Sequence, residues 1–184
     1  MEKRIVLLVL SLFLFFSIAN VARAQEKARI TSASLSGAEK MENRDARAKI
    51  LKDYLSRYNS PLADYSETFV KQADENNLDW KLLVSISGVE STFAQQLPYN
   101  SYNAWGWGIY GNNILYFKSY DEAIKTISKS LREDYINQWG AKDVYQIGRI
   151  YASSPTWAQR VVGFMDKIDK FAQDNPKYHL SLSI

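Results

Sequence analysis

The chain contains no cysteine and only one histidine, His179, among its 184 residues. Without cysteine, disulfide scaffolds, thiol nucleophiles and thiolate-bound zinc or iron–sulfur clusters are excluded. A Ser-His-Asp triad or a multi-histidine metal site would depend on this one histidine in a polar C-terminal tail. Acid–base chemistry therefore falls to carboxylates, tyrosine or lysine, and we expect neither a metal nor a cofactor.

The chain also lacks a large excess of either charge. It has 23 Lys and Arg against 20 Asp and Glu, a net charge of +3. Residues 1–24 hold three of the basic residues and one acid, so the remainder carries 20 basic against 19 acidic residues. A nucleic-acid-binding domain shows clustered excess positive charge, so we exclude nucleic acid as a partner.

Residues 1–24 have the features of a signal peptide. A short charged start precedes the apolar stretch Ile5–Val21, and Ala22-Arg23-Ala24 is the small-x-small pattern that signal peptidase cleaves. The alternative is an uncleaved membrane tether, since these 17 residues reach the lower limit for spanning a bilayer. In either case we expect the protein to be secreted or held in the cell envelope.

Residues 25–43 are predicted to form a flexible leader, and residues 44–184 one mainly α domain, which we expect to be monomeric. A first helix is predicted by the helical spacing of four apolar residues, Ala48, Leu51, Leu55 and Tyr58. Ser60-Pro61 predicts the start of the next helix, and Asp79 predicts the cap of a nearly apolar helix from Trp80 to about Ser91.

The stretch from Phe93 to about Lys118 breaks this helical pattern, and its Gly and Asn residues predict a long loop ending in a short β-hairpin. Ser119-x-x-Glu122 is a capping box that predicts a helix ending at Gly140. Further helices are predicted at 144–151 and after Ser154-Pro155, the last with a buried stripe. That stripe comprises Trp157, Val161, Phe164, Ile168 and Phe171.

Glu90 is the candidate catalytic residue. It lies near the C-terminus of the most apolar helix, with Leu83, Ile86 and Ser87 on its face. Partial burial and the negative end of the helix dipole both favour its protonated form. A protonated Glu is what a general acid for glycosidic cleavage requires. The alternative is a Glu that points into solvent or bonds neighbouring hydroxyls.

An aromatic loop follows Glu90. Seven of the 19 residues from Tyr99 to Phe117 are aromatic, interleaved with Asn and Gly. Aromatic faces beside amide groups suit pyranose rings, although such rings fill cores as readily. We expect the substrate-binding residues to be Ser91, Asn103, Trp105, Trp107, Tyr110 and Tyr116.

These residues carry a family resemblance. The segment Gly88–Phe93, followed by Ser101–Gly108, resembles the active-site region of lysozyme-like peptidoglycan-cleaving enzymes, which include lytic transglycosylases and bacterial endo-β-N-acetylglucosaminidases. Phe117–Ile124 and Tyr151–Ala158 are similar to two glucosaminidase motifs, with Ser154 and Trp157 replacing Asp and Tyr of the second. The resemblance spans roughly Leu78 to Ile168.

The resemblance implies a lysozyme-like α+β fold, with the aromatic loop and hairpin at an active-site cleft. It implies that Glu90 is the catalytic acid, that Tyr151 supports the transition state from the cleft, and that Asn103 holds the loop. The implied partner is peptidoglycan or a related amino-sugar glycan.

The type of cleavage depends on a second carboxylate. Glycoside hydrolysis ordinarily uses two, yet no Asp or Glu occurs from Ser91 through Tyr120. A single acid fits lytic transglycosylation, which we take as the leading hypothesis. The alternatives are a hydrolytic endo-β-N-acetylglucosaminidase recruiting a distant carboxylate (Asp121, Glu122, Glu133 or Asp134) and a non-catalytic glycan-binding envelope module.

Overall fold

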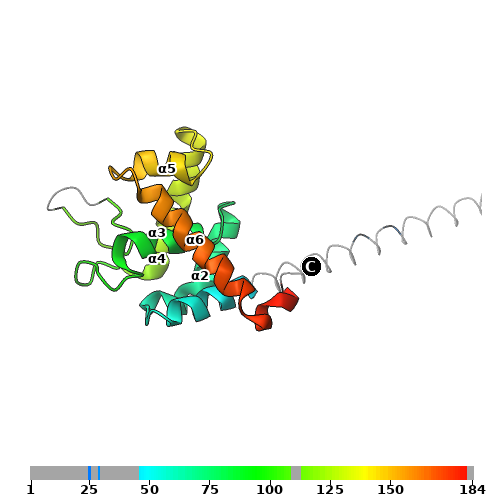
Figure 1. Cartoon of the computed structure of the whole chain (residues 1–184). Coiled ribbons are helices and arrows are strands. Elements are labelled where there is room, and N and C mark those ends of the chain that lie inside the picture. The colour runs from blue at the N-terminus through cyan, green and yellow to red at the C-terminus, as the bar shows by residue number, and fades with distance from the viewer. Residues whose placement is uncertain (1–24, 26–28, 30–45, 109–112, 182–184) are drawn as a thin grey trace, which may run out of the picture. The chain divides into compact units, whose positions relative to one another are not determined.

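A computed structural model, shown in Figure 1, describes residues 25, 29, 46–108 and 113–181. The chain divides into two units, residues 1–42 and residues 43–184, and the folded elements described below belong to the second. The predicted signal peptide lies outside the described residues, as does the predicted leader apart from Gln25 and Arg29. None of the helices in the described ranges is both long and apolar enough to cross a membrane.

The first helices begin where their caps predict. A helix at 46–56 buries Leu51 and Leu55. Ser60 then caps the 3-10 helix η1 (Pro61–Tyr65) by accepting a hydrogen bond from the Leu62 N–H, at 3.1 Å. The chain continues directly into α2 (Ser66–Glu75), which places Phe69 in the core.

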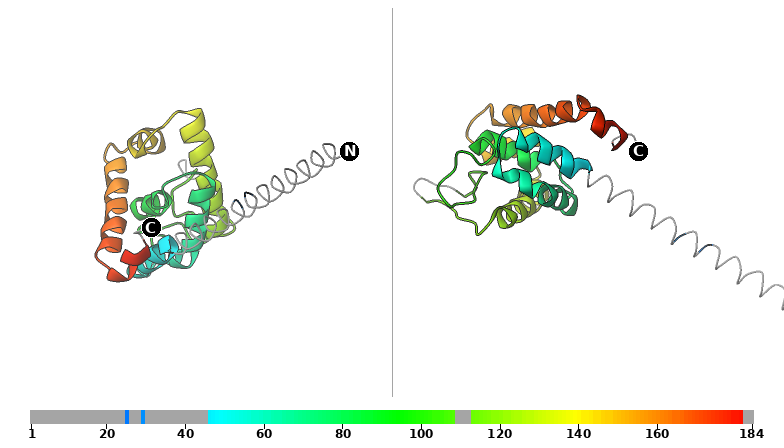
Figure 2. Two further views of the ribbon diagram at one scale, coloured as in Figure 1. Left: turned by 90° about the vertical axis from the view of Figure 1, so that its right-hand side faces the viewer. Right: turned by 90° about the horizontal axis from the view of Figure 1, so that it is seen from below.

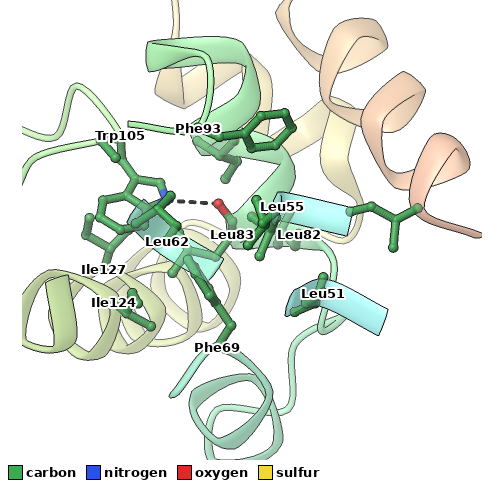
Figure 3. Packing of buried hydrophobic residues seen from close by; sticks show 14 of the residues in the cluster. Leu51, Leu55, Leu62, Phe69, Leu82, Leu83, Phe93, Trp105, Ile124 and Ile127 are labelled. Atoms are coloured by element: carbon green, nitrogen blue, oxygen red, sulfur yellow. Dashed lines mark hydrogen bonds between the residues drawn. The ribbon is translucent and has the colours of Figure 1, made fainter. Parts of the chain in front are cut away.

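Helix α3 (Leu82–Ser91) is the buried centre of the domain. Every residue from Leu82 to Gly88 is buried, as the nearly apolar sequence predicts. The predicted start is wrong, because the helix begins at Leu82 with Lys81 as its N-cap and no side-chain cap. Asp79 instead accepts a hydrogen bond from the Lys81 N–H at 2.9 Å, in the turn before the helix. Figure 3 shows the side chains gathered around α3, with the Trp105 indole donating to the Leu83 carbonyl at 2.8 Å.

The segment between α3 and α4 (Tyr120–Ser130) is a long loop, as predicted, but the predicted hairpin is not seen in its described part. Residues 93–108 and 113–119 contain one isolated bridge position, at Asn113, and no strand. The first predicted strand of the hairpin, Ile109-Tyr110, and the turn residues Gly111 and Asn112 lie outside the described residues. The domain is therefore mainly helical.

Helix α4 begins at the predicted capping box, where the Glu122 N–H donates to the Ser119 hydroxyl at 3.2 Å. It continues as a π-helix, η2 (Leu131–Gln138), which the sequence did not predict. In this wider helix the Trp139 N–H donates to the Asp134 carbonyl at 2.8 Å. Gly140, at φ +74°, ends the helix as predicted.

The C-terminal part consists of α5 (Val144–Tyr151), α6 (Trp157–Gln173) and the 3-10 helix η3 (Pro176–Ser181). Helix α6 packs along α3, while α5 contacts both α6 and η2. The left view in Figure 2 shows α6 on one side and η2 on the other, with α5 between their ends. Helix α6, which begins at Trp157, therefore lies beside α3, which ends one residue after Glu90.

Candidate active site

Helix α3 ends in an unusual backbone turn directly after Glu90 and Ser91. Thr92, Phe93 and Ala94 have φ values of 53°, 57° and 66°, in the left-handed region. This conformation costs an L-residue roughly 1–2 kcal/mol. Buried polar contacts hold the turn, because the Ser91 hydroxyl donates to the Ala104 carbonyl at 2.7 Å and accepts from the Ala94 N–H at 2.9 Å. Strain maintained in this way is characteristic of functional sites.

The Glu90 side chain is exposed, so the prediction that burial favours its protonated form is wrong. One carboxylate oxygen is nevertheless fixed, since Oε1 accepts a hydrogen bond of 2.6 Å from the Trp157 indole N–H. The other oxygen, Oε2, lies beside Gly106, where an added Cβ would stand only 3.3 Å away. Glu90 thus has one oxygen held by the protein and the other beside the loop.

The Tyr151 ring packs against the Trp157 ring. The two rings stack with centroids 4.7 Å apart and an interplanar angle of 23°, and the Tyr151 hydroxyl donates to the Trp105 carbonyl at 2.7 Å. Burial, and then the nearby negative charge of Glu90, raise the pKa of the Tyr151 hydroxyl well above its ordinary value. Tyr151 is therefore a neutral donor that ties the loop to α5.

Further rings extend this stack into a series, which we call the aromatic wall. The centroid of the Trp107 ring lies 5.6 Å from that of Tyr151 and 5.7 Å from that of Tyr135. The centroids of the Tyr135 and Trp139 rings lie 4.9 Å apart. Trp157 is 1% exposed at the Glu90 end, whereas Trp139 is 52% exposed at the other. The wall, as defined here, consists of Trp107, Tyr135, Trp139, Tyr151 and Trp157.

Sequence reasoning did not assign Tyr135, Trp139 or Trp157 to the site. Trp157 was predicted as a core residue and as the replacement of a motif Tyr, without a role at Glu90. A buried indole N–H needs an acceptor, and that requirement was a usable signal. Tyr135 comes from the π-helix and Trp139 from its C-cap, and the register of this helix has no sequence signature. The wall is thus built largely outside the loop that was predicted to form it.

Three of the predicted substrate-binding residues are structural. Trp105 is fully buried and Ser91 is 3% exposed, so both belong to the core and not to a substrate-binding surface. Asn103 is also buried, and its amide accepts from the Trp107 N–H and donates to the carbonyls of Trp107 and Leu115, at 2.8–2.9 Å. Asn103 therefore holds the loop beside Glu90.

Of the remaining predicted residues, the structure describes Trp107 and Tyr116. Trp107 is half-buried in the aromatic wall, while Tyr116 is exposed. Tyr110 lies outside the described residues.

The other candidate carboxylates each have a structural partner. Asp121 accepts from the Thr68 hydroxyl at 2.7 Å, Glu122 from the Lys118 N–H at 2.5 Å, and Asp134 from the Ser130 hydroxyl. Glu133 is an exposed side chain 3.8 Å from Lys129. Within the described ranges, no cluster of three His, Cys, Asp or Glu side chains could hold a metal ion.

No protein-family model, curated protein or solved structure matches this chain.

Proposed function

We propose that this protein is an exported enzyme that cleaves the β-1,4 bond between amino sugars of peptidoglycan, with a lysozyme-like fold and Glu90 as its general acid and base. The observation that carries the proposal is the 2.6 Å hydrogen bond from the Trp157 indole to Glu90, at the exposed end of a buried helix. The bond fixes a carboxyl group beside a wall of aromatic rings.

The two oxygens of Glu90 then have different roles. Because Oε1 accepts the Trp157 N–H, the proton of the acid form resides on Oε2. Glu90 donates this proton to the glycosidic oxygen as the bond from that oxygen to the sugar C1 breaks. The resulting carboxylate can remove a proton from the 6-hydroxyl of the same sugar as it attacks C1, which gives a 1,6-anhydro product and restores the acid.

The lytic outcome is favoured because, among the residues that the structure describes, Glu90 contacts no second carboxylate of the kind that hydrolysis ordinarily uses. The loop beside it contains no Asp or Glu, and the acids of α4 and η2 cap helices, bond neighbouring side chains or remain on the exposed surface. The substrate's own acetamido or 6-hydroxyl group would then supply the nucleophile.

The aromatic wall supplies a surface suited to the glycan. Pyranose rings present an apolar face that packs on indole and phenol rings. Trp139 is the exposed ring of the wall, and the other members lead from it to Trp157, which holds Glu90. We assign substrate binding to the exposed and partly exposed rings of this wall, Trp139, Tyr135 and Trp107, and a positioning role to the buried Trp157.

The decisive experiment is digestion of purified peptidoglycan by Glu90→Gln, with mass spectrometry of the released fragments. Glutamine keeps an oxygen for the Trp157 N–H but cannot donate and accept the catalytic proton, so release should fall at least about a hundredfold. Glu67→Gln, which changes an exposed Glu on α2, is the matched control and should retain activity.

The products distinguish the candidate reactions. Anhydro ends identify lytic cleavage, whereas reducing N-acetylglucosamine ends identify hydrolysis by a glucosaminidase. Glycan binding without turnover in the unmodified protein would identify a non-catalytic envelope module. Unchanged fragment release by Glu90→Gln would falsify the assignment of Glu90.

A further inference from the structure

A second candidate site lies away from Glu90, between the end of the first helix and the C-terminal half of α6. It is an open groove of about 440 Å³, a volume that accommodates a ligand the size of a monosaccharide. Glu90 and the aromatic wall are not among its lining residues. The groove is lined by Tyr54, Arg57 and Tyr58 on one side and by Lys167, Lys170, Phe171 and Asp174 on the other.

The groove carries an excess of positive charge. Its three cations face one carboxylate, Asp174, which pairs with Lys170 at 3.2 Å. In the part of the chain that the structure describes, Arg57 and Lys167 form no ion pair with a carboxylate. Two cations are thus left to attract an anion from solution.

Aromatic rings position these two cations without neutralising them. The Arg57 guanidinium carbon lies 5.4 Å from the centre of the Phe171 ring, and the Lys167 ammonium 4.6 Å from the centre of the Phe164 ring. Cation–π contacts of this kind orient a charged group while leaving its N–H donors free for another acceptor.

Two tyrosines that line the groove add a neutral donor. The hydroxyls of Tyr54 and Tyr58 lie 3.3 Å apart and either can donate to the other, so one phenolic proton remains for a ligand. Burial raises the pKa of Tyr54, which keeps its hydroxyl protonated. A guanidinium, an ammonium and a phenol form a donor set that suits phosphate or carboxylate oxygens.

From this arrangement we propose that the groove is a binding site for an oxyanion, phosphate or carboxylate, carried on a sugar-sized body. The body packs against the partly exposed rings of Tyr58 and Phe171, while the anion meets Arg57 and Lys167. The site is separate from Glu90 and does not depend on the function proposed above.

The test is calorimetric titration of the full chain with glucose 6-phosphate, glucuronate and glucose, at low and at about 0.15 M salt. Both anions should bind, more weakly at higher salt, and glucose should not. Binding of only one anion supports the site and identifies its chemistry. The double variant Arg57→Gln/Lys167→Gln should weaken anion binding at least about tenfold, because each charged hydrogen bond contributes about that factor.

The matched control is Lys125→Gln/Lys129→Gln, which removes the same charge from the exposed face of α4. It should leave anion binding unchanged, and circular dichroism should show every variant folded. Equal weakening by both double variants would overturn the site, since binding would then follow net charge alone. Equal binding of glucose, or no binding of either anion, would overturn it as well.

Discussion

Two neighbouring tryptophans in the loop have opposite environments, and the residue between them explains why. Trp105 is fully buried, with its indole bonded to Leu83, whereas Trp107 lies in the aromatic wall. Gly106, at φ +60°, turns the backbone between them. The same turn brings the loop against Glu90, so this glycine links core packing to the geometry of the site.

Gly106→Ala should therefore damage the site as well as the fold. Alanine at positive φ costs roughly 1–2 kcal/mol, and its Cβ would stand 3.3 Å from Glu90 Oε2. Gly140→Ala is the matched control, because φ is +74° there but the Cβ would meet nothing within 4 Å. Urea unfolding should show a similar decrease in the free energy of unfolding for both variants. Only Gly106→Ala should also lose glycan cleavage. Equal activities at equal stability would contradict the role given to Gly106.

Ser85 offers a second prediction at this scale. Its hydroxyl is buried in α3 and has no hydrogen-bond partner among the described residues, which costs free energy. Ser85→Ala should raise the free energy of unfolding by about 1 kcal/mol. Ser87→Ala, in the same helix, removes a hydroxyl that donates to the Val84 carbonyl at 2.7 Å. This variant should raise the free energy of unfolding by less than Ser85→Ala does, or lower it. Chemical denaturation of both variants decides the point, and a loss from Ser85→Ala would refute it.

At the scale of elements, the local signals in the sequence predicted most helices. Ser60 and Ser119 cap the helices that they were predicted to cap, and the apolar spacing of α3 predicted its burial. These signals act over three or four residues, so the sequence displays them directly.

Features that depend on distant residues were not predictable in this way. Trp157 reaches Glu90 across 67 residues of sequence, and the π-helix η2 follows α4 without a change of pattern. Glu90 was correctly placed at the end of α3, but its exposure depends on how α6 and the loop pack around it. Packing between elements decided these points, which explains why Trp105 and Trp107 could not be told apart.

The contact between α5 and α6 positions Trp157, and Gly148 makes that contact possible. A Cβ at Gly148 would lie 2.9 Å from Trp157 Cε3 and 3.0 Å from Ala158 Cβ. Gly148→Ala should therefore displace Trp157, lower stability and reduce cleavage. Gly163→Ala in α6, where a Cβ meets nothing within 4 Å, should instead raise the free energy of unfolding by about 0.5–1 kcal/mol and preserve activity. Thermal unfolding and glycan release measure both effects. A Gly148→Ala variant as active as Gly163→Ala would show that this contact does not position Glu90.

The π-helix places Trp139 at the exposed end of the aromatic wall. Because Trp139 lies several rings from Glu90, Trp139→Ala should raise the KM for glycan about three- to tenfold and leave kcat nearly unchanged. Tyr145→Ala removes a similarly exposed ring from α5 and serves as the control. Steady-state kinetics on soluble glycan fragments separate the two parameters, and a loss confined to kcat would place Trp139 outside the binding surface.

For the whole molecule, tyrosines connect elements that are distant in sequence. Burial raises the pKa of tyrosines in five elements: the first helix, η1, α4, α5 and η3. These residues are Tyr54, Tyr65, Tyr120, Tyr151 and Tyr178. Several make contacts between elements, for example Tyr65 with Tyr120 and Tyr178 with Phe171. The folded domain therefore depends on its tyrosines being neutral.

This dependence predicts how stability changes at alkaline pH. An unfolded tyrosine ionises near pH 10, whereas these five ionise at higher pH when folded. The unfolded chain thus loses protons that the folded chain retains, so the stabilisation is complete below about pH 10 and is lost as the pH rises through the folded values. Urea unfolding is measured between about pH 8 and 11.5, with tyrosinate absorbance recorded in parallel. The free energy of unfolding should fall steadily above about pH 10. Tyr120→Phe should lessen the fall, whereas Tyr99→Phe, which alters a side chain that is 87% exposed, should not. A free energy of unfolding that stays constant across this range would show that the buried tyrosines do not couple proton binding to folding.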